Sequence, residues 1–264
     1  MFVKNGDFVK NVVFKTEQVI IQQTQQGTTN RRCYIVGNGN SMTLNDNNYV
    51  IEHDPLMSYF VPKVSKKYSA YVFYYTFNAD LISAGKDIAT FFDTLSAEYN
   101  QNFLVGHSKC SITLYTTTAT YKYPQKIKLV TVSPPALGTP IANKEYVHSI
   151  LRRKFLIKLY DNIFSDHRVD RDIMPGSKAI QILTKMTLTS NTVHINIKSK
   201  FRTIFSCRNP LDLLLYWLDK KLGLEGDGMV PFSSQDFKNA PLTKEFHCSH
   251  LCSLNKTLHY LESL

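Results

Sequence analysis

Short apolar runs rich in β-branched and aromatic residues recur through the first half of the chain and predict the strands of a sheet. They cover residues 8–14, 18–23, 33–36, 71–75 and 101–107. The run at 71–75 is apolar on both of its faces, as expected of a strand buried in a parallel sheet. Glycine and asparagine alternate over residues 37–40 and predict a loop directly after the run at 33–36.

Apolar positions at helical spacing separate some of these runs. Ile82, Ile88, Phe92 and Leu95 recur in this way and predict an amphipathic helix over residues 82–99. A polar segment compatible with a helix follows the run at 101–107, and another β-rich run covers 127–132. The alternation of strands and helices describes successive βαβ units, so we expect an α/β fold with a parallel sheet flanked by helices.

The pattern changes after Pro140. Residues 144–190 are mostly helical in composition, residues 193–197 alternate as a strand does, and residues 210–222 are a strongly apolar helical stretch. No internal repeat is evident. The length of 264 residues fits one large domain over 1–264 better than two small ones.

Composition favours a soluble α/β protein. Hydrophobic residues make up 43% and charged residues 20% of the chain, so a sizeable core is expected and global disorder is not. No apolar run approaches eighteen residues, and the first residues lack the apolar stretch of a secretory signal, so we expect neither a transmembrane segment nor a signal peptide. A cytoplasmic location follows, with export by an unconventional route as the alternative.

The five cysteines are odd in number and scattered, so a reducing compartment is expected rather than a disulfide framework. Cys248 and Cys252 flank a histidine, but no second cysteine pair at metal-site spacing exists, so we expect no metal and no cofactor.

The net charge of +10 suggests an anionic partner. The basic residues are nevertheless spread along the chain, and the short clusters at 31–32, 66–67 and 152–154 form no recognisable nucleic-acid module. A solvated basic surface is therefore the favoured interpretation, and nucleic-acid binding is not expected.

The most informative stretch is Val105-Gly106-His107-Ser108-Lys109-Cys110. A strand that ends at Gly-x-Ser and turns into a helix is the nucleophile elbow of a serine hydrolase, although the fifth position here is Cys110 instead of glycine. Downstream come Asp227, between two glycines, and then His250. Their order matches the Ser, Asp, His order of α/β-hydrolases, so we predict Ser108 as nucleophile, His250 as general base and acid, and Asp227 as the residue that orients the imidazole. His247 is the alternative base.

Five blocks in this order resemble α/β-hydrolases of the lipase/esterase type, in particular triacylglycerol lipases and GPI-inositol-deacylase-like proteins. The blocks are residues 103–108, 130–140, 172–177, 226–231 and 249–251. The resemblance implies the α/β-hydrolase fold, with a mostly parallel central sheet flanked by helices and a helical cap or lid insertion, which we place at residues 141–200. It also implies hydrolysis of carboxylic esters through an acyl-enzyme, without a cofactor.

The chain departs from that pattern around the oxyanion hole. Lys109 can supply the first N–H donor through its backbone, although methionine, glutamine or leucine would be expected beside an apolar acyl pocket. The His-Gly that lipases carry after the first core strand is replaced, so the backbone N–H of Asn38 or Gly39 is the expected second donor. Cys252 and Ser253 occupy the place where secreted bacterial lipases have a calcium-binding aspartate, so no calcium is expected.

The expected cap mixes apolar residues such as Phe155 and Leu156 with basic ones such as Arg152 and Lys158. Such a lid would suit an ester at an anionic membrane surface, whereas a plain cap would only pack over the sheet. Lipid or fatty-acyl esters are the first substrate expectation and small soluble esters the second. A non-catalytic lipid- or protein-binding module and an acyltransferase using the same triad remain the alternative functions.

Overall fold

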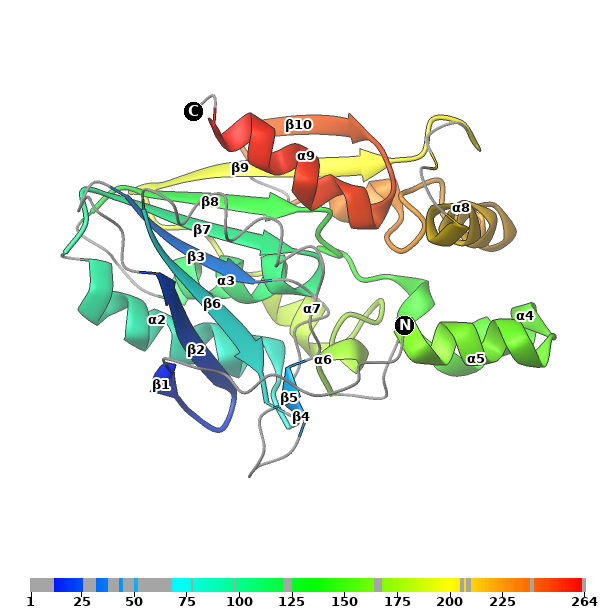
Figure 1. Ribbon diagram of the computed structural model, residues 1–264, viewed down its shortest axis with the longest axis horizontal. Coiled ribbons are helices and arrows are strands. Elements are labelled where there is room, and N and C mark those ends of the chain that lie inside the picture. The colour runs from blue at the N-terminus through cyan, green and yellow to red at the C-terminus, as the bar shows by residue number, and fades with distance from the viewer. Residues whose placement is uncertain are drawn as a thin grey trace.

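A computed structural model describes residues 12–25, 32–37, 43–44, 50–51, 68–76, 78–96, 98–120, 125–163, 168–204, 207, 210–237 and 240–262. Its centre is an eight-stranded sheet in the order β1-β2-β6-β3-β7-β8-β9-β10 (Figure 1). The strands are β1 Val12–Lys15, β2 Val19–Gln25, β3 Arg32–Gly37, β6 Ser69–Tyr75, β7 Gln101–His107, β8 Ile127–Val132, β9 Thr192–Lys200 and β10 Leu242–His247. The short strands β4 Thr43–Leu44 and β5 Val50–Ile51 pair separately.

The sheet is mostly parallel. The six strands from β6 to β10 in the sheet order run parallel to their neighbours, whereas β1 and β2 are antiparallel additions at one edge. Parallel strands have their carboxyl ends at the same edge of a sheet, so the segments that follow β7, β8, β9 and β10 all leave from one edge.

Helices cover both faces of the sheet, as Figure 1 shows. Helices α2 Leu81–Ser96 and α3 Lys109–Thr120 lie on one face, and α9 His250–Glu262 lies on the other. Strand β7 contributes to both cores, since Leu104 packs in the cluster of α2 and α3, while Phe103 and Val105 pack in the cluster of α9. The strands predicted over 71–75, 101–107 and 127–132 are thereby confirmed, as is the predicted helix at 82–99, although α2 ends at Ser96.

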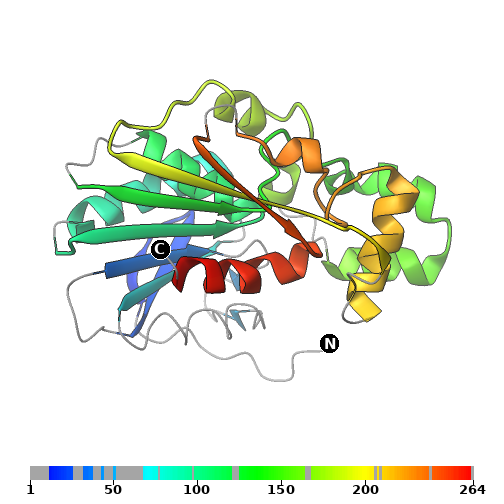
Figure 2. The same cartoon turned by 90° about the horizontal axis from the view of Figure 1, so that it is seen from above.

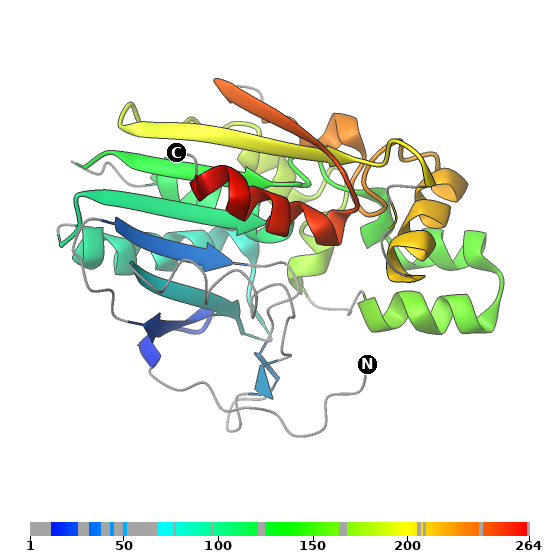
Figure 3. The same cartoon turned by 45° about the horizontal axis from the view of Figure 1, so that its top comes forward.

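The described residues between β8 and β9 form the short 3-10 helix η1 Pro140–Ala142 and four α-helices: α4 Lys144–Leu151, α5 Lys154–Ile163, α6 Arg168–Arg171 and α7 Lys178–Leu183. Helices α4 and α5, together with α8 Pro210–Leu222, lie beyond the carboxyl edge of the sheet (Figures 2 and 3). They share a third apolar cluster, which also includes Met229 and Val230 from the loop after α8.

The range 141–200, predicted as a cap, does not all lie outside the sheet. Residues 192–200 form β9, which pairs with β8 on one side and β10 on the other, so this part of the range belongs to the core. Val169 of α6 and Ile180 of α7 also pack in the α2–α3 core cluster. Among the described helices of this range, α4 and α5 extend away from the sheet (Figure 1), and a cap function for them remains a prediction.

In the part of the chain that the structure describes, no helix combines the length and apolar character needed to cross a membrane.

Candidate active site

Ser108 forms a sharp turn between β7 and α3. Its φ is +56°, in the left-handed region that residues other than glycine rarely adopt, and its N–H donates to the Val132 carbonyl at 2.8 Å. Such strained residues cluster at functional sites. The turn also needs Gly106, because a Cβ there would lie 2.6 Å from the Cys110 carbonyl oxygen at the start of α3. The strand, turn and helix predicted around Ser108 are therefore present.

Cys110, the unexpected residue of the elbow, is fully buried. Its Cβ lies 3.0 Å from where a Cβ on Gly37 of β3 would stand, so the small side chain fills the space between the helix and the sheet. A buried thiol facing the sheet has no access to a substrate, which leaves Ser108 as the candidate nucleophile.

The structure brings Asp227 and His250 together. Nδ1 of His250 lies 2.8 Å from Oδ2 of Asp227, and the backbone N–H of His250 donates to the Asp227 carbonyl at 3.0 Å. Both side chains are buried. Because the carboxylate only accepts, Nδ1 carries the proton of the neutral imidazole, and Nε2 presents its lone pair.

Nε2 of His250 is buried and has no hydrogen-bond partner among the described residues, Ser108 included. A catalytic hydrogen bond that is long in the free enzyme commonly shortens only when substrate binds. The atom is therefore an unsatisfied acceptor at the edge of the sheet where the Ser108 turn lies.

Asp227 is held in place by several donors. Oδ1 accepts from the N–H groups of Met229 at 3.1 Å and Val230 at 2.9 Å, and Oδ2 accepts from the Ser199 hydroxyl at 2.7 Å. Burial alone would raise the pKa of Asp227, but attraction to the protonated form of His250 and these hydrogen bonds outweigh it and lower the pKa below its ordinary value. The carboxylate thus stays ionised beside the imidazole.

Two further residues fix Ser199 beside this carboxylate. The Gln235 side chain pairs with the Ser199 backbone, accepting from its N–H at 2.7 Å and donating to its carbonyl at 2.8 Å. The Ser133 hydroxyl lies 2.5 Å from that of Ser199; since Ser199 gives its only proton to Asp227, Ser133 is the donor. None of these residues belongs to a motif that sequence reasoning had singled out as catalytic.

His107 lies next to His250. Its Nε2 is 2.9 Å from the His250 carbonyl, and the two ring centroids are 4.6 Å apart. Burial, and then the charge of His250, lowers the pKa of His107 to about 3, so this ring is neutral at pH 7. Because a carbonyl only accepts, Nε2 carries the proton. The residue holds the first turn of α9 against the end of β7, a role that the sequence did not reveal.

His247, the alternative base, is exposed at the end of β10, and its carbonyl accepts from the Lys256 ammonium at 3.0 Å. It is His250 that reaches Asp227. Among the described residues, no group of three or more histidines, cysteines or acidic residues is placed to hold a metal ion.

Lys109 is the first residue of α3, where backbone N–H groups have no partner within the helix, as an oxyanion donor requires. Its side chain is buried in an ion pair, with Nζ 2.5 Å from Oδ1 of Asp170 in α6. The pairing explains how a lysine is accommodated where an apolar residue was expected. The other predicted donors, Asn38 and Gly39, lie outside the described residues.

The sequence matches no protein-family model and no curated protein. Solved structures do match. The mature form of the Bacillus licheniformis lipase BlEst2 is similar with a TM-score of 0.62 at 13% identity, over 94% of this chain and 97% of the lipase. A lipase-esterase related protein from Clostridium acetobutylicum is similar with a TM-score of 0.51 at 10% identity, over 93% of this chain and 99% of that protein. Carboxylesterase CesB from Bacillus subtilis is similar with a TM-score of 0.50 at 10% identity, over 99% of this chain and 91% of the carboxylesterase.

Sequence identity this low supports a statement about the fold alone. The eight-stranded, mostly parallel sheet flanked by helices is the α/β-hydrolase fold, as the sequence blocks had implied.

Proposed function

We propose that this chain, which has the α/β-hydrolase fold, is a serine hydrolase that cleaves carboxylic esters. The observation that carries the proposal is the buried pair of His250 and Asp227, with the acceptor Nε2 unsatisfied, at the sheet edge where Ser108 is held in its strained turn. A neutral imidazole oriented by an ionised carboxylate is the arrangement that activates a serine hydroxyl.

In the proposed mechanism, Ser108 Oγ attacks the ester carbonyl carbon while His250 Nε2 takes the hydroxyl proton. Asp227 stabilises the imidazolium that forms. The oxyanion accepts from the Lys109 backbone N–H, with Asn38 or Gly39 as the second donor. The imidazolium then protonates the leaving alkoxide, and the acyl group stays on Ser108. A water molecule, deprotonated by His250, attacks the acyl-enzyme and releases the acid.

Lipid or fatty-acyl esters are the proposed substrates, and small soluble esters the alternative. Support comes from the surface beyond the carboxyl edge of the sheet. Three consecutive basic residues at 152–154 are exposed at the turn between α4 and α5, and Leu213 and Trp217 of α8 are 47% and 40% exposed. Exposed cations and exposed apolar side chains on helices beyond the same edge of the sheet suit peripheral contact with an anionic membrane surface.

A fluorophosphonate probe, which reacts with activated serines, tests the proposal. We expect labelling of the wild type, none of Ser108→Ala, and severe loss in His250→Ala, whereas the matched variant His247→Ala should label normally. A folded wild type that resists labelling would contradict the proposal and favour a non-catalytic binding module. Loss in His247→Ala alone would overturn the assignment of the base.

Hydrolysis of p-nitrophenyl esters of graded chain length then separates a lipase from an esterase. A labelled protein that hydrolyses none of them, yet transfers acyl groups to an added acceptor, would be an acyltransferase.

A further inference from the structure

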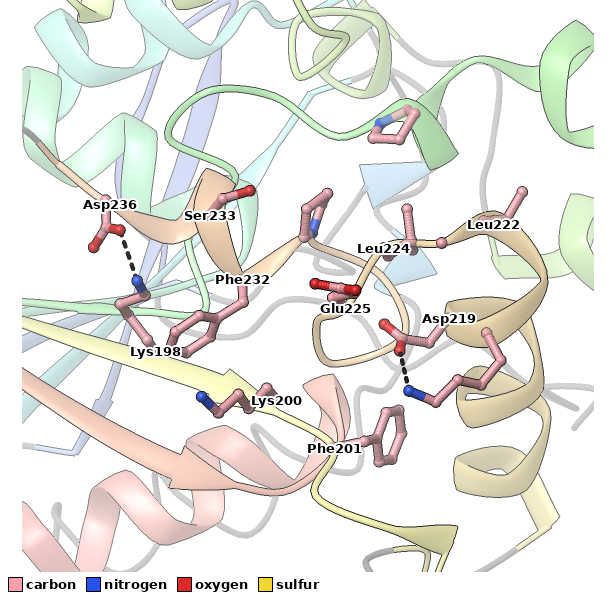
Figure 4. A pocket seen from close by; sticks show the side chains of 14 residues that line it. Lys198, Lys200, Phe201, Asp219, Leu222, Leu224, Glu225, Phe232, Ser233 and Asp236 are labelled. Atoms are coloured by element: carbon pink, nitrogen blue, oxygen red, sulfur yellow. Dashed lines mark hydrogen bonds and ion pairs between the residues drawn. The ribbon is translucent and has the colours of Figure 1, made fainter.

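Residues on both sides of the loop that carries Asp227 line a cavity of about 750 Å³, whose lining side chains Figure 4 shows. One wall is the end of β9, with Lys198 and Lys200. A second wall is formed by the short helix η3 Phe232–Gln235 and Asp236 after it. The third is the end of α8 with the following residues 223–225. None of the residues that line this cavity takes part in the proposed mechanism.

The three walls are the same segments that position Asp227. On β9, Ser199 lies between the two lysines and donates to the Asp227 carboxylate. Gln235 of η3 pairs with the Ser199 backbone. At the end of α8, Asp219 lines the cavity and accepts from the Gly226 N–H at 2.8 Å, which fixes the residue before Asp227. A molecule that contacts all three walls would therefore restrict the movement of the segments that position Asp227.

The β9 wall has the chemistry of an anion site. The Nζ atoms of Lys198 and Lys200 lie 3.8 and 4.1 Å from the centroid of the Phe232 ring, which Figure 4 shows between them. Both ammonium groups therefore lie at the same aromatic ring on this wall. Lys198 has one carboxylate partner, Asp236 at 2.7 Å, and that carboxylate is half exposed.

Lys200 has less compensation. In the described part of the chain, its Nζ lies 3.7 Å from Oε2 of Glu245, which is beyond hydrogen-bond length. An ammonium has three N–H donors. The Lys200 side chain lines the cavity and is 35% exposed, so a ligand there can reach its ammonium.

Besides Asp236, which pairs with Lys198, two acidic residues line the cavity, and they lie on the α8 wall. Asp219 and Glu225 belong to the α8 side in Figure 4, where Lys220 lies 3.9 Å from the Asp219 carboxylate. Apolar side chains that also line the cavity complete its surface: Pro140, Phe201, Leu222, Leu224 and Pro231. A ligand in the cavity can therefore contact the ammonium groups of the β9 wall and apolar side chains of the remaining lining.

We propose that this cavity binds a small organic carboxylate with an apolar body, with its anionic end at Lys198 and Lys200, and that the bound ligand orders the segments that hold Asp227. This is the chemical class of the acid that an ester hydrolase releases. Binding stands independently of the proposed function, whereas the effect on Ser108 reactivity rests on it.

Calorimetric titration with benzoate tests the site. We expect saturable binding to the wild type and binding weakened about tenfold or more in Lys200→Gln, the size of a lost charge-assisted contact. Lys221→Gln, which removes an exposed α8 lysine outside the cavity, should bind as the wild type does. Benzamide, which has the same shape without the charge, should bind much more weakly than benzoate. No saturable binding at millimolar benzoate, or equal binding by Lys200→Gln, would overturn the site.

Fluorophosphonate labelling separates this cavity from the active site and tests the coupling. Protein already phosphonylated on Ser108 should still bind benzoate; loss of binding there would place the ligand in the active site instead. Benzoate should raise the labelling rate of the wild type about fivefold, at the lower end of ordinary coupling, and leave Lys200→Gln unchanged. An unchanged or reduced rate in the wild type would overturn the coupling. A wild type that binds benzoate through Lys200 but is never labelled keeps the site and loses the proposed hydrolase function.

Discussion

His107 is expected to make the protein lose stability in mild acid. The folded protein holds this ring neutral, with a pKa lowered to about 3 by burial and then by the charge of His250. An unfolded histidine has a pKa of about 6.5. Between these values the unfolded state binds more protons than the folded state, so the free energy of unfolding falls as the pH falls. Replacing His107 by glutamine, which keeps an N–H donor for the His250 carbonyl, should remove this dependence.

The size of the effect follows from the two pKa values. Linkage gives a loss of about 2 kcal/mol from this one residue between pH 7 and pH 5. His194, whose pKa burial lowers to about 4, contributes a loss of similar size over the same interval. The wild type therefore loses unfolding free energy through both histidines between pH 7 and pH 5. A variant that lacks either histidine should lose about half as much over this interval.

Urea unfolding followed by circular dichroism at pH 7 and pH 5 measures the difference. His107→Gln is expected to be less stable than the wild type at pH 7, because a buried ring is lost, yet to lose about 2 kcal/mol less on going to pH 5. His194→Gln is the matched variant, with a similar reduction. If His107→Gln kept the full pH dependence of the wild type, the ring would not be neutral and buried as described, and the reasoning would fail.

Three further substitutions test the packing of the site. Lys109→Met breaks the buried ion pair with Asp170 and should lower the free energy of unfolding in urea by about 3 kcal/mol, most of which the double variant with Asp170→Asn should restore. Ser199→Ala removes one buried donor to Asp227 and should lower the rate of fluorophosphonate labelling about tenfold and the thermal midpoint by a few degrees; a normal rate would show that the hydroxyl does not position the carboxylate. Gly106→Ala places a Cβ 2.6 Å from the backbone of α3 and should lower stability by about 2 kcal/mol or more, so an unchanged thermal midpoint would contradict the close approach described.

The fold could be predicted from the sequence where burial on both faces left a plain signal. Strands β6, β7 and β8 lie inside the sheet, and their continuous apolar runs mark them. Strand β10 was missed because it is an edge strand, almost entirely exposed, in which charged residues interrupt the apolar ones. Antiparallel β1 and β2 also gave no sign of their direction, since an amphipathic run does not encode its partner's orientation.

The candidate site divides in the same way. Ser108, Asp227 and His250 each sit in a short motif, so their order along the chain pointed to them. Their supporting residues come from distant segments that meet only in the folded protein. The predicted strand at 193–197 ended too early because residues 198–200 are polar, whereas β9 continues to Lys200 and Ser199 in this stretch bonds to Asp227. The polar residues at the end of the buried strand β9 therefore include one that supports the candidate site.

The position of His250 at the start of α9 has a consequence for biosynthesis. Ser108 and its turn are made long before α9, and domains begin to fold as the chain emerges from the ribosome. In the proposed hydrolase, a nascent chain thus carries Ser108 without the base His250, and Asp227 without the imidazole that it would orient. In the proposed hydrolase, the strained serine stays unreactive throughout translation, and turnover begins only once α9 has docked against the finished sheet.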